Sequence, residues 1–133
     1  MPAQSTPRPL VVVVDDTPAV RQLISRVLEL DGHVVAEAPD GVAATRLLEG
    51  LSDPPALVIT DLKMPTMSGE ALGQWVKAHY PHVPVLFISG FPAEHSVELP
   101  GPFLPKPFTN DGLIEAVRVA LRNGNPSAAA REA

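Results

Sequence analysis

The sequence predicts an α/β domain in which a doubly wound, five-stranded parallel sheet carries helices on both faces. Short apolar runs rich in Val, Ile and Leu alternate with longer amphipathic segments, which is typical of successive βα units. Several of these runs are continuously apolar, as strands buried on both faces are. The length of 133 residues is that of one domain.

The first strand and helix are the best defined elements. Residues 10–14 are apolar and β-branched apart from one Leu, and they predict a buried strand. Thr17 is the expected cap of a helix with Pro18 at its first position. The helix reaches about Leu30 and ends at Gly32. Five apolar residues are expected on its inward face: Val20, Leu23, Ile24, Val27 and Leu28.

The next elements repeat this order. Residues 33–37 are half polar and predict an edge strand. Asp40 is expected to cap a second helix that continues through Leu48. Residues 56–60 are again apolar and predict a third, buried strand that ends at Asp61.

The third helix and the fourth strand follow a second capping residue. Ser68 is expected to cap a helix over 69–79, and residues 83–88 predict a strand that ends at Ser89. The segment after this strand is rich in proline, which is excluded from helix interiors. Only about residues 93–98 are free of it, so we expect the helix after the fourth strand to be vestigial or absent.

The last two elements are a short strand and a long helix. Residues 103–104 predict the strand, and Thr109 or Asn110 is expected to cap a helix that reaches about Arg122. We therefore expect a domain over residues 10–122. A flexible leader (1–9) and a flexible tail (123–133) are expected to flank it, because both are rich in small and turn-forming residues.

Composition and charge exclude several classes of protein. The chain has 10 Lys and Arg against 15 Asp and Glu, a formal net charge of −5, so no basic surface for nucleic acid is expected. It contains no Cys, which removes disulfides, thiolate metal sites and cysteine catalysis. No apolar run could cross a bilayer and no signal peptide is recognisable. We therefore expect a cytoplasmic protein without membrane contact.

The residues that could carry chemistry lie where the predicted strands end. Asp15, Asp16, Asp61 and Ser89 follow three different strands, and Lys106 follows the last one. The carboxyl ends of parallel strands share one edge of the sheet, where doubly wound folds bind ligands. Each residue alone would be compatible with a turn, a cap or a surface position. As a set, they are expected to meet at one site.

Three neighbouring carboxylates repel one another and favour a neutralising cation. Mg²⁺ is the natural choice for a few carboxylates plus water, and Lys106 would add a fixed positive charge. Such a site suits phosphoryl transfer, in which an Asp can be the nucleophile and form an acyl phosphate. Ser89 could donate a hydrogen bond to the transferred group. A lone lysine at a solvated edge contributes little to stability, so Lys106 is expected to serve the response more than the fold.

These segments resemble the response-regulator receiver domains of two-component signalling over roughly residues 10–122. The matching pieces are Val-Val-Val-Val-Asp-Asp-Thr-Pro (11–18), Leu-Val-Ile-Thr-Asp-Leu-Lys-Met-Pro-Thr-Met-Ser-Gly (57–69), Pro-Val-Leu-Phe-Ile-Ser-Gly (84–90) and Phe-Leu-Pro-Lys-Pro-Phe (103–108). The resemblance implies the flavodoxin-like strand order 2-1-3-4-5. It also implies a phosphoacceptor module that is phosphorylated by a histidine kinase or a histidine phosphotransfer protein and signals to a downstream protein by a conformational change.

The resemblance further implies roles for single residues. Asp61 would accept the phosphoryl group. Asp15, Asp16, Asp61 and the backbone carbonyl of Lys63 would hold Mg²⁺, with Asp15 acting mainly through water.

Ser89 and Lys106 would contact the phosphoryl oxygens, and Phe103 would be the aromatic residue whose rotation reports phosphorylation. The bond before Pro107 is expected to be cis. The segment 87–91, Phe-Ile-Ser-Gly-Phe, resembles a receiver subgroup with a shortened fourth helix. In that case, output would use the first and last helices or ordering of the loop.

The alternative function is a Mg²⁺-dependent phosphohydrolase with an Asp nucleophile after the first strand. That class normally has a second acid two residues after the first, where this chain has Thr17, and it needs a cap domain. A flavodoxin-like cofactor binder would need a glycine-rich phosphate loop where this chain has two acids. We therefore expect no enzyme, apart from self-catalysed phosphorylation and dephosphorylation.

Overall fold

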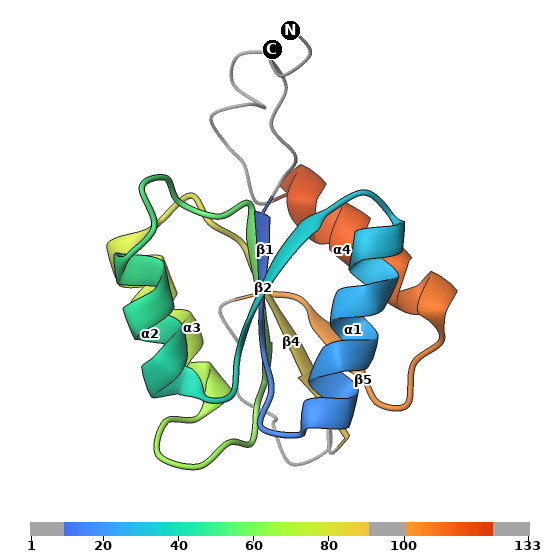
Figure 1. Cartoon of the computed structure of the whole chain (residues 1–133), viewed down its shortest axis with the longest axis horizontal. Coiled ribbons are helices and arrows are strands. Elements are labelled where there is room, and N and C mark those ends of the chain that lie inside the picture. The colour runs from blue at the N-terminus through green and yellow to red at the C-terminus, as the bar shows by residue number, and fades with distance from the viewer. Residues whose placement is uncertain (1–9, 91–100, 124–133) are drawn as a thin grey trace, which may run out of the picture.

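The computed structural model describes residues 10–90 and 101–123. Five parallel strands form one sheet in the order β2-β1-β3-β4-β5. They are β1 (Leu10–Val14), β2 (Val34–Ala38), β3 (Leu57–Asp61), β4 (Val85–Ser89) and β5 (Phe103–Pro105). The described helices are α1 (Pro18–Leu30), α2 (Gly41–Glu49), α3 (Gly69–His79) and α4 (Asn110–Asn123). Helices α1 and α4 cover one face and α2 and α3 the other (Figure 1), which confirms the predicted fold.

Each face of the sheet has its own apolar core. Successive residues of β1 point to opposite faces. Val11 and Val13 pack in the core that includes α1 and α4, whereas Val12 and Val14 pack in the core that includes α2 and α3. All four are fully buried, which explains why this strand is continuously apolar.

Helix α1 ends in a Schellman motif, which moves the start of β2. Gly32 has a φ of +97°, and its N–H donates to Glu29 O at 3.1 Å while the N–H of His33 donates to Leu28 O at 3.0 Å. His33 is therefore committed to closing the helix. The predicted start of the strand at His33 is wrong by one residue, and β2 begins at Val34.

Strands β3 and β4 are displaced toward the carboxyl edge by one or two residues relative to the prediction. Asp61 and Ser89, expected just after the strands, are their last residues. Strand β4 begins after Pro84, which has no N–H to donate. The N–H of Val83 is used in a turn, because it donates to Tyr80 O at 2.9 Å. The predicted start at Val83 is therefore wrong.

Three of the four predicted caps are made by side chains. The side-chain oxygens of Asp40, Ser68 and Thr109 each accept the backbone N–H three residues later, at 2.8, 3.1 and 2.9 Å. Thr17 occupies the cap position of α1, but its side chain makes no capping hydrogen bond. Its backbone N–H donates to Asp15 Oδ1 at 2.8 Å. The predicted cap position is therefore confirmed, but it lacks a side-chain capping hydrogen bond.

The inward face of α1 is narrower than predicted. Ile24, Val27 and Leu28 are buried, and Val20 is half-buried, but Leu23 is 49% exposed. Because an apolar stripe of three or four residues per two turns already faces the core, Leu23 remains at its solvent margin. Its predicted burial is wrong.

Some predictions concern residues outside the described part of the chain. The shortened or absent helix over 93–98 lies there, and so does the leader over 1–9. Helix α4 extends to Asn123, one residue beyond its predicted end, and the rest of the predicted tail lies outside. Within the described residues, no helix has both the length and the apolar character needed to span a membrane.

Candidate functional site

The strand register brings two acids together at the carboxyl edge of the sheet. Val14 pairs with Thr60 in the β1–β3 ladder, so Asp15, just after β1, lies beside Asp61 at the end of β3. The chain leaves β1 for β2 on one side and returns for β3 on the other. The strand order therefore reverses between the two acids, at the position where folds of this kind bind ligands.

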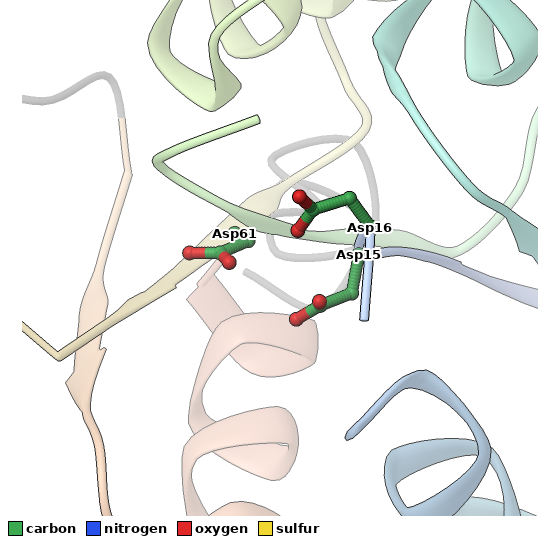
Figure 2. Close-up of side chains that lie close together, drawn as sticks. All are labelled: Asp15, Asp16 and Asp61. Atoms are coloured by element: carbon green, nitrogen blue, oxygen red, sulfur yellow. The ribbon is translucent and has the colours of Figure 1, made fainter. Parts of the chain in front are cut away.

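Asp15, Asp16 and Asp61 form a cluster at this edge (Figure 2). One carboxylate oxygen from each lies within 4.8 Å of the other two. Asp15 is 1% exposed and Asp61 is 9% exposed, whereas Asp16 is exposed. The cluster is thus largely enclosed by protein but accessible to solvent at Asp16.

Lys106 contacts two of the three carboxylates. Its Nζ lies 3.5 Å from Asp15 Oδ2 and 3.4 Å from Asp61 Oδ2. The side chain is 25% exposed, so Lys106 lies largely enclosed against the acids with which it was expected to meet. Its removal would leave two buried carboxylates without their cation, so we expect Lys106 to contribute to stability as well as to the response.

The Asp61 carboxyl is electrostatically unusual. Burial raises its pKa above the ordinary value, and the neighbouring charge of Asp15 raises it further. The Lys106 ammonium opposes both effects, and so does the backbone N–H of Lys63, which donates to Asp61 Oδ1 at 3.4 Å. The net direction of the pKa is upward because burial, the largest cause, outweighs the attraction of the lysine.

Backbone groups hold the two buried acids in place. The N–H of Thr17 fixes one oxygen of Asp15, and the N–H of Gly69 donates to Leu62 O at 2.9 Å. A Cβ at position 69 would lie only 1.9 Å from the carbonyl oxygen of Asp61. Helix α3 can start this close to the acid only because position 69 is a glycine.

The remaining predicted site residues lie along β4 and β5. Ser89 is buried at the end of β4, and its carbonyl accepts the backbone N–H of Lys106 at 2.9 Å. This hydrogen bond fixes Lys106 beside the strand that carries Ser89. Phe103 is half-buried and packs against the core on the α2–α3 face. The Lys106–Pro107 peptide bond is cis.

One side chain near the cluster, Arg21, was not among the predicted site residues. Its Nη1 donates to the backbone carbonyl of Asp15 at 2.8 Å, and its Nε pairs with Glu37 Oε1 at 3.0 Å. Arg21 is an ordinary position of an amphipathic helix, and Glu37 lies 16 residues away. No local pattern could have identified this contact.

The donor set fits a hard divalent cation. Three carboxylates carry three negative charges, and one lysine offsets one of them. Mg²⁺ binds carboxylate oxygens and retains several waters, which agrees with a cluster that is open on one side. Lys63 is exposed beside Asp61, and the role of its carbonyl as a ligand stays a prediction.

This fold and this edge of the sheet define a receiver domain of two-component signalling. The chain belongs to the response regulator receiver domain family, whose model matches residues 11–118.

The relatives include both kinases and response regulators. The chain is 34% identical over 116 residues to the sensor kinase CckA of Brucella abortus, a match that covers 84% of this chain and 12% of the kinase. It is 31% identical over 125 residues to the response regulator MprA of Mycobacterium bovis, covering 90% of this chain and 54% of that protein. The chain thus spans about half or less of the length of these relatives.

A solved structure agrees with the fold and the family. The receiver domain from the hybrid histidine kinase CckA has 34% sequence identity and a TM-score of 0.74 to this chain. The match covers 84% of this chain and 98% of that one.

Proposed function

We propose that this receiver domain accepts a phosphoryl group on Asp61 in a Mg²⁺-dependent reaction and signals by a conformational change. The observation that carries the proposal is the surroundings of the Asp61 carboxylate. It lies 3.4 Å from the Lys106 ammonium and within 4.8 Å of an oxygen of each of two further acids. A nucleophile, a cation and a set of metal ligands are the parts that phosphoryl transfer needs.

The donor in this proposal is a phosphohistidine of a histidine kinase or a histidine phosphotransfer protein. A carboxylate oxygen of Asp61 attacks the phosphorus, the new O–P bond forms, and the N–P bond breaks with its electron pair left on the imidazole nitrogen. Asp15, Asp16, Asp61 and the carbonyl of Lys63 would hold Mg²⁺, which when bound offsets the charge of the carboxylates and of the transferred group.

Ser89 and Lys106 would then bind the phosphoryl oxygens. The two residues are linked through the backbone, since the N–H of Lys106 donates to the carbonyl of Ser89. A dianionic group on Asp61 would draw the hydroxyl and the ammonium toward it. Phe103 lies three residues before Lys106, and its packing would change in response.

An apolar hollow of about 430 Å³ beside Lys106 supports a protein donor. It is lined by Val20, Leu23, Lys106, Pro107 and Phe108, and Leu23 is one of the exposed large apolar residues of α1. A small phosphodonor would need no apolar contact there, whereas a partner domain that brings a histidine to Asp61 would bury it.

We also propose that the chain performs no turnover of free substrates and that it acts in the cytoplasm without binding nucleic acid. For a phosphohydrolase, the position two residues after Asp15 would have to supply an acid, but it is Thr17, and only its backbone N–H reaches Asp15. The net charge of −5 gives no basic surface for nucleic acid. Release of phosphate from a phosphomonoester over many turnovers would contradict this part of the proposal.

Phosphorylation of Asp61 can be tested with a small phosphodonor and Mg²⁺. The parent protein should gain the mass of one phosphoryl group, and the label should be labile to hydroxylamine, as an acyl phosphate is. Asp61→Asn should gain none. Asp53→Asn is the matched control because Asp53 is an exposed acid before β3, and it should behave like the parent. Stoichiometric, hydroxylamine-labile labelling of Asp61→Asn would refute the assignment.

The metal is tested separately by Asp16→Ala. Mg²⁺ should raise the melting temperature of the parent, since a ligand that binds only the folded state stabilises it. Asp16→Ala should lose most of this increase. Its metal-free form should be as stable as the metal-free parent or more stable, because one of three repelling carboxylates is gone. Full-rate phosphorylation of the parent in excess chelator would refute the requirement for Mg²⁺.

A further inference from the structure

Arg21 connects α1 to two other elements at the carboxyl edge of the sheet. Its Nη1 donates to the carbonyl oxygen of Asp15 at 2.8 Å, and its Nε pairs with Glu37 Oε1 of β2 at 3.0 Å. The Arg21 side chain is only 16% exposed. Both contacts are charge-assisted, and the guanidinium presents its donors in a fixed geometry. The side chain therefore has little freedom to move.

The carbonyl that Arg21 binds belongs to the peptide group between Asp15 and Asp16. Strand β1 ends at Val14, and the β1–β3 ladder also ends there, so this peptide lies beyond the regular sheet. The N–H of Asp15 still reaches Ala38 O at 3.2 Å. The next peptide group joins Asp15 to Asp16, and its carbonyl oxygen accepts a hydrogen bond from the Arg21 guanidinium.

The position of Arg21 suggests more than a link between α1 and β2. It is the fourth residue of α1, near the positive end of the helix dipole, where a cation is unfavourable. The ion pair with Glu37 is one contact made from this position. From this position the guanidinium also reaches Asp15 O. The peptide that it holds sets the directions in which the side chains of Asp15 and Asp16, two of the three clustered acids, leave the backbone.

We infer that Arg21 is a positioning residue for the acid cluster: by holding the Asp15–Asp16 peptide, it sets the geometry in which the carboxylates bind Mg²⁺. This inference rests on the proposed function, because the metal site is part of that proposal. It assigns no contact between Arg21 and the metal or the phosphoryl group. Changing residues that orient metal ligands without touching the metal typically costs about 10- to 100-fold in metal affinity.

The test measures Mg²⁺ binding to the unphosphorylated full chain by calorimetry, with Arg21→Met as the principal variant. We expect its Kd for Mg²⁺ to rise by about tenfold or more. Glu37→Ala removes the other partner of Arg21 but leaves the Asp15 contact, and its Kd should rise by much less. Arg118→Met is the matched control, since Arg118 pairs with Asp31 at the opposite end of α1, and its Kd should equal that of the parent.

A second measurement needs no metal. The amide of Asp16 shares its peptide group with the carbonyl that Arg21 binds, so its ¹⁵N chemical shift in the Mg²⁺-free protein should change in Arg21→Met and stay near the parental value in Glu37→Ala. Arg21→Lys keeps the charge and can donate to one acceptor, so it should recover part of the affinity. It also decides the question if Arg21→Met does not fold.

The outcomes separate the inference from the proposed function. A parent that binds Mg²⁺, with Arg21→Met binding equally well, would overturn the inference and leave the proposed function standing. Equal losses in Arg21→Met and Glu37→Ala would also overturn it, because the effect would then come from the ion pair between α1 and β2. A parent that binds no Mg²⁺ would overturn both.

Discussion

The close approach of Gly69 to Asp61 gives a prediction whose size can be worked from the structure. In Gly69→Ala, the new Cβ would lie 1.9 Å from the carbonyl oxygen of Asp61 and 2.8 Å from the Cα of Leu62. Ordinary contact begins at 3.4 Å, so the start of α3 and the end of β3 must separate by 3.4 − 1.9 = 1.5 Å. Neither side is free to yield, since Asp61 is paired with Ile88 in the β3–β4 ladder and Ser68 caps the helix.

Two effects are expected from this displacement. Overpacking of this kind typically lowers the free energy of unfolding by about 1–3 kcal/mol, which for a domain of this size is a fall in Tm of at least about 4 °C. A displacement of about 1 Å at a reacting group can cost on the order of 100-fold in rate. We therefore expect Gly69→Ala to be phosphorylated at least about tenfold more slowly at saturating Mg²⁺.

Urea and thermal unfolding measure the first effect, and the rate of phosphoryl-protein formation from a small donor measures the second. Gly50→Ala is the matched control, because Gly50 also lies at a helix end but has right-handed helical conformation. A Cβ added there would lie 3.6 Å from the nearest atoms. It should be neutral or stabilising by up to about 1 kcal/mol. Gly69→Ala with parental stability and parental rate would refute the steric argument.

Three further predictions concern charge and backbone conformation. The raised pKa of Asp61 means that the folded state binds its proton more tightly than the unfolded state, so Asp61 favours folding below its unfolded pKa and loses this contribution as pH rises through the folded pKa. Metal-free Asp61→Asn should therefore be more stable than the parent at pH 7, and urea titrations at falling pH should show this advantage disappear; an advantage that grows in acid would contradict it. Lys106→Met should lower the stability of the metal-free protein by about 1–2 kcal/mol, and Mg²⁺ should stabilise it more than it stabilises the parent; an unchanged Tm without metal would contradict this. Thr66 has a φ of 66°, in the left-handed region, so Thr66→Gly should raise the free energy of unfolding by roughly 0.5–1 kcal/mol; a loss of stability would show that its side-chain contacts outweigh the strain.

The local elements were predictable because their causes are local. A continuous apolar run gave β1, and the caps Asp40, Ser68 and Thr109 marked the starts of their helices. The start of β2 was missed by one residue because closing α1 requires the N–H of His33. Such hydrogen bonds are a feature of the folded helix end that residue types indicate only approximately.

The site was predictable only as a set of residues at one edge. The parallel topology brings strand ends together whatever the register is, so Asp15, Asp16 and Asp61 could be grouped from the sequence. The strand order itself came from the resemblance, since the residues alone do not state which strands are neighbours. The structure confirms this order.

The tertiary structure alone decided how these residues contact one another. Lys106 meets Asp15 across 91 positions of sequence and Asp61 across 45, and its distances to them make it the counterion of two buried acids. Arg21 donates to Asp15 O, the side chain of Thr17 makes no capping hydrogen bond, and Leu23 is exposed to solvent. Each outcome depends on which elements pack side by side and at what distance. A sequence pattern indicates which positions of a single helix or strand are buried and which are exposed. Contacts between elements are fixed only when the whole chain has packed.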